Sequence, residues 1–165
     1  GLKPGQIVRS RYHPSMLILP ADLLDAVYAH GEATFPSECC GCILGTRSGD
    51  DRHAVRLVPA HNQRAEERND RYEIGPEDRK AAEDRAAADG LAVIGFYHSH
   101  PDHDAYFSQT DLEHSEEYAW GEPWIPPTYA YLVVSIHGGA RSHHKAFLVV
   151  DGAAVAEPTA VSTAG

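Results

Sequence analysis

Two histidines separated by a single residue, His98 and His100, are the side chains of this 165-residue sequence best placed to bind a metal ion. They directly follow Leu91–Tyr97, a near-continuous apolar run that predicts a strand buried on both faces. Residues i and i+2 of a strand point to the same side, so both imidazoles can face one ion. Two neutral imidazoles make a good but incomplete zinc site, so the pattern calls for a third ligand.

Asp111 is the candidate third ligand, eleven residues after His100 and in the first turn of a helix expected at about 108–118. Three protein ligands leave the fourth position to water, which is the geometry of a catalytic zinc rather than a structural one. Ser108 and Asp111 also match a capping box, S-x-x-D, which would explain both residues as helix-start chemistry. The two roles compete only in part, because an N-cap Ser lies at the positive helix end, where developing negative charge is stabilised.

The elements that must position these residues form an α/β pattern of about six strands and three helices, without an internal repeat. Strands are expected at 16–19, 40–45, 53–59, 91–97, 129–136 and 145–150, with a further short one at 72–74. Helices are expected at 21–33, 76–90 and about 108–118. A polar loop is expected at 61–70, an irregular loop at 121–127 and a weakly structured tail from residue 153.

Bulk composition predicts one globular domain with one substantial core. Hydrophobic residues make up 42% of the chain and charged residues 23%, both near ordinary values. Apolar runs are too short to cross a bilayer and no signal peptide is recognisable, so a cytoplasmic location without a membrane partner is expected. The net charge of -10 disfavours a nucleic-acid partner, which would require clustered Lys and Arg.

Three cysteines lie together at Cys39, Cys40 and Cys42. Adjacent cysteines bridge each other only with strain, and no second Cys or His pair stands at the spacing of a structural zinc site. We therefore expect small, buried, reduced thiols beside a strand, which fits the cytosol.

The segment His98–Pro101, followed by six residues, Ser108, two residues and Asp111, reads H-x-H-P-x6-S-x2-D without a gap. This resembles the JAMM signature of the MPN-domain (Mov34/Pad1) zinc metallopeptidases. A Glu followed by Cys-Gly and a strand is the second family signature, and Glu38–Gly41 resembles its form in compact prokaryotic members. The resemblance implies a single-domain MPN fold, related to that of cytidine deaminases, with a mixed sheet flanked by helices. It predicts an N-terminal extension over 1–15, the metallopeptidase domain over 16–157 and a flexible tail over 158–165.

The resemblance also implies roles for the site residues. His98, His100 and Asp111 would hold one zinc ion per chain, which brings the pKa of a bound water to about 7. Glu38 would take a proton from that water and pass it to the leaving amine. Ser108 would donate its hydroxyl to the oxyanion of the tetrahedral intermediate. The residue types alone do not distinguish Glu38 from the other carboxylates, so its role comes from the resemblance.

Several residues near these positions have two interpretations. Asp102 and His103 flank the site and could contact substrate, although a solvated loop is the simpler interpretation. Tyr97 and Trp124 could line a groove for an extended peptide, with core packing and loop anchoring as the alternatives. The pair His143–His144 is expected on the surface.

Members of the resembled family cleave amide or isopeptide bonds after the Gly-Gly terminus of ubiquitin or ubiquitin-like proteins. Compact prokaryotic members act on ubiquitin-like sulfur carriers or small-protein modifiers. The resemblance therefore implies an isopeptidase of the desampylase or carrier-processing kind, acting as a monomer or homodimer on a partner with a Gly-Gly tail. Such a tail is thin enough to lie as an added strand along a narrow groove.

Two other classes stay open. A catalytically silent MPN scaffold could bind ubiquitin-like proteins, but such members usually lack the metal ligands that this chain has. A zinc deaminase would show H-x-E followed by P-C-x-x-C, and that combined pattern is absent from this sequence.

Overall fold

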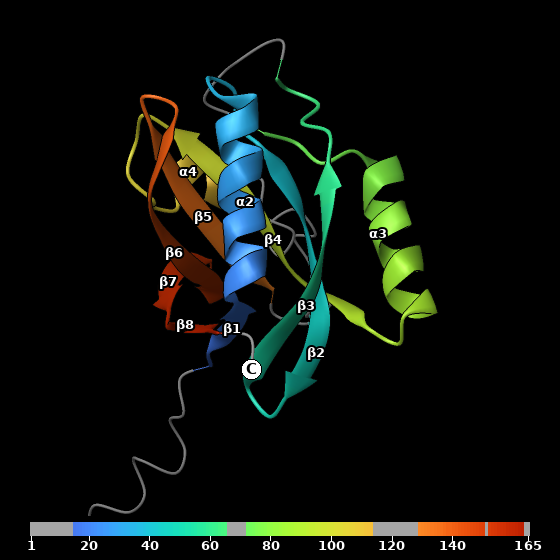
Figure 1. Cartoon of the computed structure of the whole chain (residues 1–165). Helices are drawn as coiled ribbons and strands as arrows, with labels where there is room; N and C mark the ends of the chain where they lie inside the picture. The colour runs from blue at the N-terminus through green and yellow to red at the C-terminus, as the bar shows by residue number, and fades with distance from the viewer. Residues whose placement is uncertain (1–14, 66–71, 114–128, 151, 164–165) are drawn as a thin grey trace, which may run out of the picture.

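The computed structural model describes residues 15–65, 72–113, 129–150 and 152–163, and in these residues eight strands form one sheet. Two long helices pack on the sheet, and a short third helix follows the central strand in the chain (Figure 1). The prediction of an α/β fold with a mixed sheet flanked by helices is confirmed.

The helices are α2 (Ala21–Thr34), α3 (Pro76–Ala88) and α4 (Gln109–Glu113). The strands are β1 (Leu17–Pro20), β2 (Cys40–Ser48), β3 (Asp51–Ala60), β4 (Ala92–Pro101), β5 (Ala130–His137), β6 (Ala140–Val150), β7 (Ala153–Glu157) and β8 (Thr159–Ser162). Across the sheet they follow the order β7-β6-β5-β4-β2-β3-β1-β8. Strand β4 pairs with β5 in parallel and with β2 in the antiparallel direction, so it lies inside the sheet.

Strand β4 carries both candidate histidine ligands, and it is buried on both faces as its apolar sequence predicts. Successive side chains of a strand alternate between the faces of the sheet. Tyr97 accordingly packs in the core on the side of α2, whereas Phe96 packs in the core on the side of α3. His98 and His100 share the face of Phe96, so the two imidazoles point to the same side.

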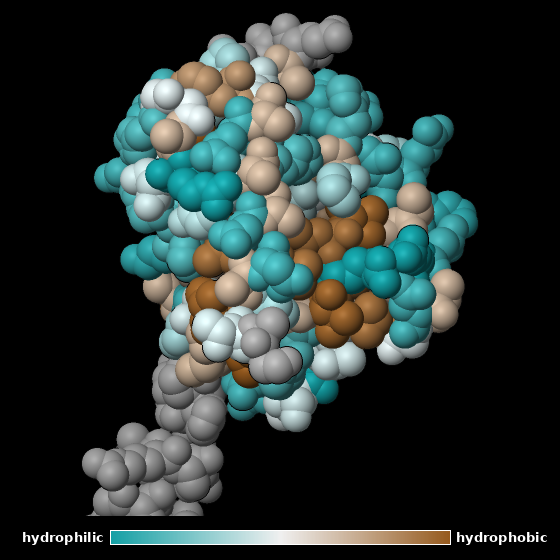
Figure 2. Space-filling view, in the orientation of Figure 1, coloured by the Kyte–Doolittle hydropathy of each residue, from teal (hydrophilic) through white to brown (hydrophobic). Residues whose placement is uncertain are grey.

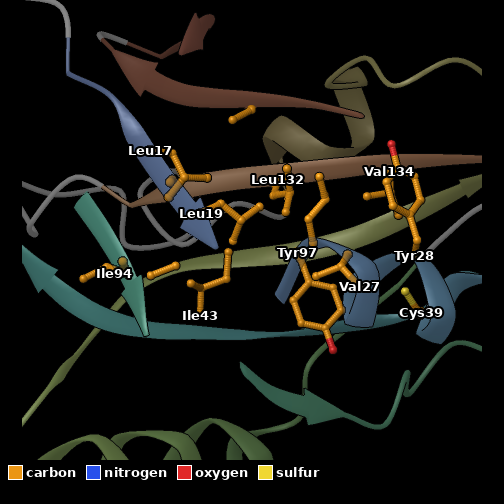
Figure 3. Close-up of a cluster of buried hydrophobic side chains, with 14 of the residues drawn as sticks. Leu17, Leu19, Val27, Tyr28, Cys39, Ile43, Ile94, Tyr97, Leu132 and Val134 are labelled. Atoms are coloured by element: carbon orange, nitrogen blue, oxygen red, sulfur yellow. The ribbon is translucent and has the colours of Figure 1, made fainter. Parts of the chain in front are cut away.

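Helix α2 covers one face of the sheet with residues at helical spacing. Its buried positions are Leu24, Val27, Tyr28 and Gly31. Figure 3 shows Val27 and Tyr28 among the buried side chains of the sheet, around Tyr97. A Cβ atom at Gly31 would lie 3.0 Å from Ile136 and 3.2 Å from Ser99. The glycine therefore lets the last turn of α2 pack closely on the side chains of Ile136 in β5 and of Ser99, the residue between the two histidines of β4.

Helix α3 covers the opposite face. It begins at Pro76 with Glu77 and Asp78 in its first turn, as predicted, and it buries Ala82 and Ala86 against the second core cluster. For the helix predicted at about 108–118, the structure describes α4 over 109–113. Residues 114–118, together with the predicted loop 121–127 and Trp124, lie outside the described residues.

Two strand predictions need correction. The segment predicted as a strand at 72–74 forms only one isolated bridge, between Ile74 and Asn62. Strand β6 begins at Ala140, five residues before the predicted start. Gly138 and Gly139 adopt positive φ values of 58° and 85°, which closes a tight turn and brings the polar start of β6 into register with β5.

The prediction of a weakly structured tail from residue 153 is wrong. Strand β7 pairs with β6, and β8 pairs in parallel with β1, so the sheet continues past the domain boundary predicted at 157. Small residues give little local signal for a strand, and here the partners supply the order. Glu157, the last residue of β7, forms a buried ion pair of 2.6 Å with Arg52 of β3.

The three cysteines are free and buried, as predicted. Burial raises the pKa of the Cys39 thiol to about 12 and raises that of Cys40 as well, so both stay protonated at neutral pH. Among the helices in the described residues, none is both long and apolar enough to span a membrane.

Candidate metal centre

Three ligand atoms converge at the end of β4, namely Nε2 of His98, Nε2 of His100 and Oδ2 of Asp111. The two nitrogens are 3.3 Å apart, and each lies 3.1 Å from the carboxylate oxygen. All three residues are buried. Within the described part of the chain, these three residues form the group of His, Cys, Asp or Glu side chains whose ligand atoms lie close enough together to hold a metal ion. The fold thus brings together the three ligands predicted from the sequence.

The spacing of these atoms fits tetrahedral zinc. Bonds of about 2.0 to 2.1 Å in a regular tetrahedron place ligand atoms about 3.3 to 3.4 Å apart. The observed 3.3 Å between the two nitrogens lies at the lower end of that range, and the 3.1 Å from each nitrogen to the carboxylate oxygen lies just below it. Two imidazoles and one carboxylate form a donor set that leaves one tetrahedral position to water or substrate.

The charges at the centre also favour a cation. Burial lowers the pKa of His98, and the nearby carboxylate of Asp111 only partly opposes this effect. Burial opposes the ionisation of Asp111, but the two imidazoles more than offset it, so the pKa of Asp111 lies well below its usual range. The ionised, buried carboxylate of Asp111 carries a negative charge that a divalent metal ion would compensate.

The two imidazoles are held in different ways. Nδ1 of His100 donates a hydrogen bond of 2.9 Å to the carbonyl oxygen of Asp104, which leaves the lone pair on Nε2 facing the centre. The His98 ring instead stacks on Tyr72, with centroids 4.4 Å apart and planes 21° apart. Tyr106 contacts the His100 ring edge to face at 4.9 Å. Hydrogen bonding orients one ligand, and aromatic packing orients the other.

Asp111 and Ser108 form the capping box at the start of α4. The N–H of Asp111 donates to Oγ of Ser108 at 2.9 Å, and the N–H of Ser108 donates to Oδ2 of Asp111 at 3.0 Å. The same Oδ2 faces both imidazoles, so capping and metal binding use one carboxylate together. Because Oγ of Ser108 acts as an acceptor in this box, its hydroxyl proton can be donated to another oxygen.

Glu38 is buried just before β2 and is tied to β4 through its backbone. Cys40 is the register partner of His98. The N–H of Cys39 donates a 2.8 Å hydrogen bond to Oγ of Ser99, and the N–H of Ser99 donates to the carbonyl of Cys39 at 3.2 Å. Continued two residues before the start of β2, this antiparallel register would set Glu38 opposite His100. The fold therefore places Glu38 beside the ligand strand, while its role as a proton carrier stays a prediction.

Residue types alone did not single out three side chains that support the centre. Ser99 anchors the backbone next to Glu38, and Asn62 donates from Nδ2 to the carbonyl of Glu38 at 3.0 Å. Tyr72 stacks on His98, and burial raises its pKa well above the usual range, so its hydroxyl stays a donor. Ser99 had a local signal, because it lies between the two histidines. The other two had none.

Tyr97 packs in the core, and its hydroxyl also reaches a surface groove. The hydroxyl lies 2.8 Å from Nδ1 of His30. Both residues line a hollow of about 420 Å³ between α2 and β3, with apolar walls that include Leu23 and Leu57. Figure 2 shows apolar side chains on this part of the surface. Core packing of Tyr97 is confirmed, and a role in peptide binding stays a prediction.

The loop that joins His100 to Ser108 is exposed at Asp102 and His103, as expected for a solvated loop. Asp102 adopts a φ of 60°, and its carboxylate accepts a 2.7 Å hydrogen bond from the N–H of Gly138. The predicted surface position of His143 is also confirmed, and its neighbour His144 is half-buried.

A family model described as prokaryotic homologs of the JAB domain matches residues 20–147. The chain belongs to this family. The matched segment includes Glu38 and the whole motif from His98 to Asp111. The JAMM/MPN resemblance drawn from the motifs is therefore confirmed.

Two named relatives cover most of the chain. The chain is 33% identical over 133 residues to a desampylase of Haloferax volcanii, an alignment that spans 78% of this chain and 87% of the relative. It is 32% identical over 148 residues to a CysO-cysteine peptidase of Mycobacterium tuberculosis, spanning 88% of this chain and 91% of the relative. A solved protein from Desulfitobacterium hafniense is 24% identical with a TM-score of 0.75, covering 90% of this chain and 94% of that chain. At that identity the likeness concerns the fold alone.

Proposed function

We propose that this protein is a zinc-dependent isopeptidase that hydrolyses the amide bond after the Gly-Gly terminus of a ubiquitin-like or sulfur-carrier protein. The observation that carries the proposal is the buried triangle of His98, His100 and Asp111, with ligand atoms 3.1 to 3.3 Å apart. The triangle lies in a prokaryotic JAB chain whose named relatives are a desampylase and a CysO-cysteine peptidase.

The three ligands would hold one zinc ion per chain. Zinc there would act as a Lewis acid and make water a nucleophile at neutral pH. The remaining work falls to side chains of the protein. Glu38 takes the proton from the attacking water and delivers it to the leaving amine, so its carboxylate serves first as base and then as acid. Ser108 donates its hydroxyl proton to the oxyanion that forms at the scissile carbonyl.

The low polarity around the centre strengthens both roles. Glu38 is only 3% exposed, and Tyr72 together with Phe107 packs around the ring of His98. Electrostatic interactions are stronger where water is excluded, so a hydroxyl aimed at a developing charge stabilises it more than it would in water.

The substrate class rests on the relatives. A desampylase is named for its action on a protein modifier, and a CysO-cysteine peptidase is named for its action on CysO-cysteine. Both names fit the Gly-Gly-tailed partner that the motifs imply. A cytoplasmic location, a monomeric or homodimeric state and the start of the domain at 16 stay predictions from the sequence.

The proposal is tested with a ubiquitin-like protein whose Gly-Gly terminus is fused to a short peptide. We expect the zinc-loaded protein to cleave after Gly-Gly, and Glu38→Gln to lower kcat about 100- to 10,000-fold while zinc stays bound. Glu32→Gln is the matched control, because Glu32 is a carboxylate that pairs with Arg141 at 2.9 Å and lies on α2, which covers the face of the sheet opposite to the side chains of His98 and His100. Binding of the fusion without cleavage by the intact protein would support a silent scaffold instead.

A further inference from the structure

One peptide group in the loop after β4 is hydrogen-bonded on both sides by histidines. The carbonyl oxygen of Asp104 accepts a 2.9 Å hydrogen bond from Nδ1 of the metal ligand His100. The N–H of the same peptide group belongs to Ala105, and it lies 3.0 Å from Nε2 of His143. The peptide thus links an exposed side chain of β6 to a buried ligand of the metal centre.

The direction of each hydrogen bond follows from the donors. The backbone N–H of Ala105 can only donate, so Nε2 of His143 must be the acceptor and its proton must sit on Nδ1. Oγ of Ser142 lies 3.1 Å from that Nδ1 and can accept the proton. At the other end, the carbonyl of Asp104 can only accept, so His100 carries its proton on Nδ1. This protonation state leaves Nε2 of His100 free to bind metal.

Other residues hold the first half of the same loop. The N–H of Asp102 donates to the carbonyl of Ile136, and Oγ of Ser135 donates to the carbonyl of His103, both at 2.6 Å. These bonds fix the chain up to residue 103. The Asp104 carbonyl also accepts a local 2.9 Å hydrogen bond from the N–H of Tyr106, and the bond that ties this peptide group to a distant strand is the one that the Ala105 N–H donates to His143. Since hydrogen bonds in a chain polarise one another, acceptance by His143 also strengthens the carbonyl as an acceptor for His100.

We propose that His143 is a positioning residue for the metal centre. It holds the Asp104–Ala105 peptide group in the orientation that fixes the ring position and the tautomer of His100. The inference rests on the metal centre of the proposed function. Loss of a partner bonded directly to a metal ligand costs about 10- to 100-fold in metal affinity. His143 acts one peptide further away, so we expect a loss of about 3- to 10-fold.

The test compares three single variants of the full chain. His143→Leu removes the acceptor, and His143→Gln keeps an acceptor oxygen at a similar distance from the backbone. His137→Leu is the control, because His137 contacts the Asp104 carboxylate at 3.5 Å and stacks on the His143 ring, with centroids 6.4 Å apart, but accepts no hydrogen bond from Ala105, so it separates the loss of those contacts from the loss of the acceptor. Zinc affinity is measured by competition with a chromogenic chelator. The visible absorption of the cobalt-substituted protein reports the ligand field.

We expect weaker zinc binding and a shifted cobalt spectrum for His143→Leu, with both restored by His143→Gln and unchanged in His137→Leu. An unchanged affinity and spectrum in His143→Leu would overturn the proposal, as would an equal loss in the Gln variant. The imidazole nitrogen shifts of His100, measured by NMR on the metal-free protein, report which ring nitrogen carries the proton. This measurement does not depend on zinc binding. If the three variants bind zinc as expected but the wild-type protein does not cleave after Gly-Gly, the proposed function is contradicted and the role of His143 is not.

Discussion

Replacement of Ser99 by alanine tests how the protein positions Glu38. Ser99 is fully buried, and its Oγ accepts a 2.8 Å hydrogen bond from the backbone N–H of Cys39. Alanine leaves that buried N–H without its acceptor, which costs about 1 to 3 kcal/mol. For a chain of this length, 1 kcal/mol shifts Tm by about 2 to 4 °C, so Ser99→Ala should lower Tm by about 2 to 12 °C.

The same change should lower activity through Glu38 rather than through the metal. The residue bonded to Ser99 is the immediate neighbour of Glu38, and a misplacement of about 1 Å in a catalytic group can cost about 100-fold in rate. We therefore expect kcat on the Gly-Gly fusion to fall about 10- to 100-fold while one zinc per chain is retained. Thermal unfolding, zinc analysis and steady-state kinetics are measured on one preparation, with Ser162→Ala on exposed β8 as control. A Tm and a kcat equal to those of the wild-type protein would refute the argument.

Two further predictions concern the scaffold. Arg52→Met should lower the free energy of unfolding by about 3 to 5 kcal/mol in urea titrations, because it leaves the buried carboxylate of Glu157 without its cation. The double variant Arg52→Met/Glu157→Leu should recover most of that loss. A double variant as unstable as the single one would contradict this reasoning. The thiols of Cys39, Cys40 and Cys42 should react with a thiol reagent at pH 8 only after unfolding, because all three are buried and burial raises the pKa of Cys39 to about 12. Rapid labelling of the native protein would show that the thiols are accessible.

The sequence predicts the metal ligands because their geometry follows from local rules. A strand places His98 and His100 on one face, and the capping box places Asp111 in the first turn of α4. Both rules hold in the structure, and Oδ2 of Asp111 serves the cap and the ligand triangle at once. The family motif adds what spacing cannot, namely the choice of Glu38 among the carboxylates of the chain.

The groups that support the centre escape prediction because they come from distant segments. Asn62 and Tyr72 reach the site through tertiary contacts with no fixed spacing to the histidines. In the sequence His143 is an ordinary surface residue, because its hydrogen bond with the N–H of Ala105 depends on the tertiary position of the loop. The prediction of a weakly structured tail is wrong for a related reason: strands β7 and β8 consist mostly of small residues, and their order depends on pairing with β6 and β1.

The most direct test of the central claim is the anomalous scattering of protein crystals at the zinc edge. The proposal predicts one strong peak per chain, within about 2.0 to 2.2 Å of Nε2 of His98, Nε2 of His100 and an oxygen of Asp111. Zinc-soaked crystals with no peak among these three atoms, or with zinc bound only elsewhere, would contradict it.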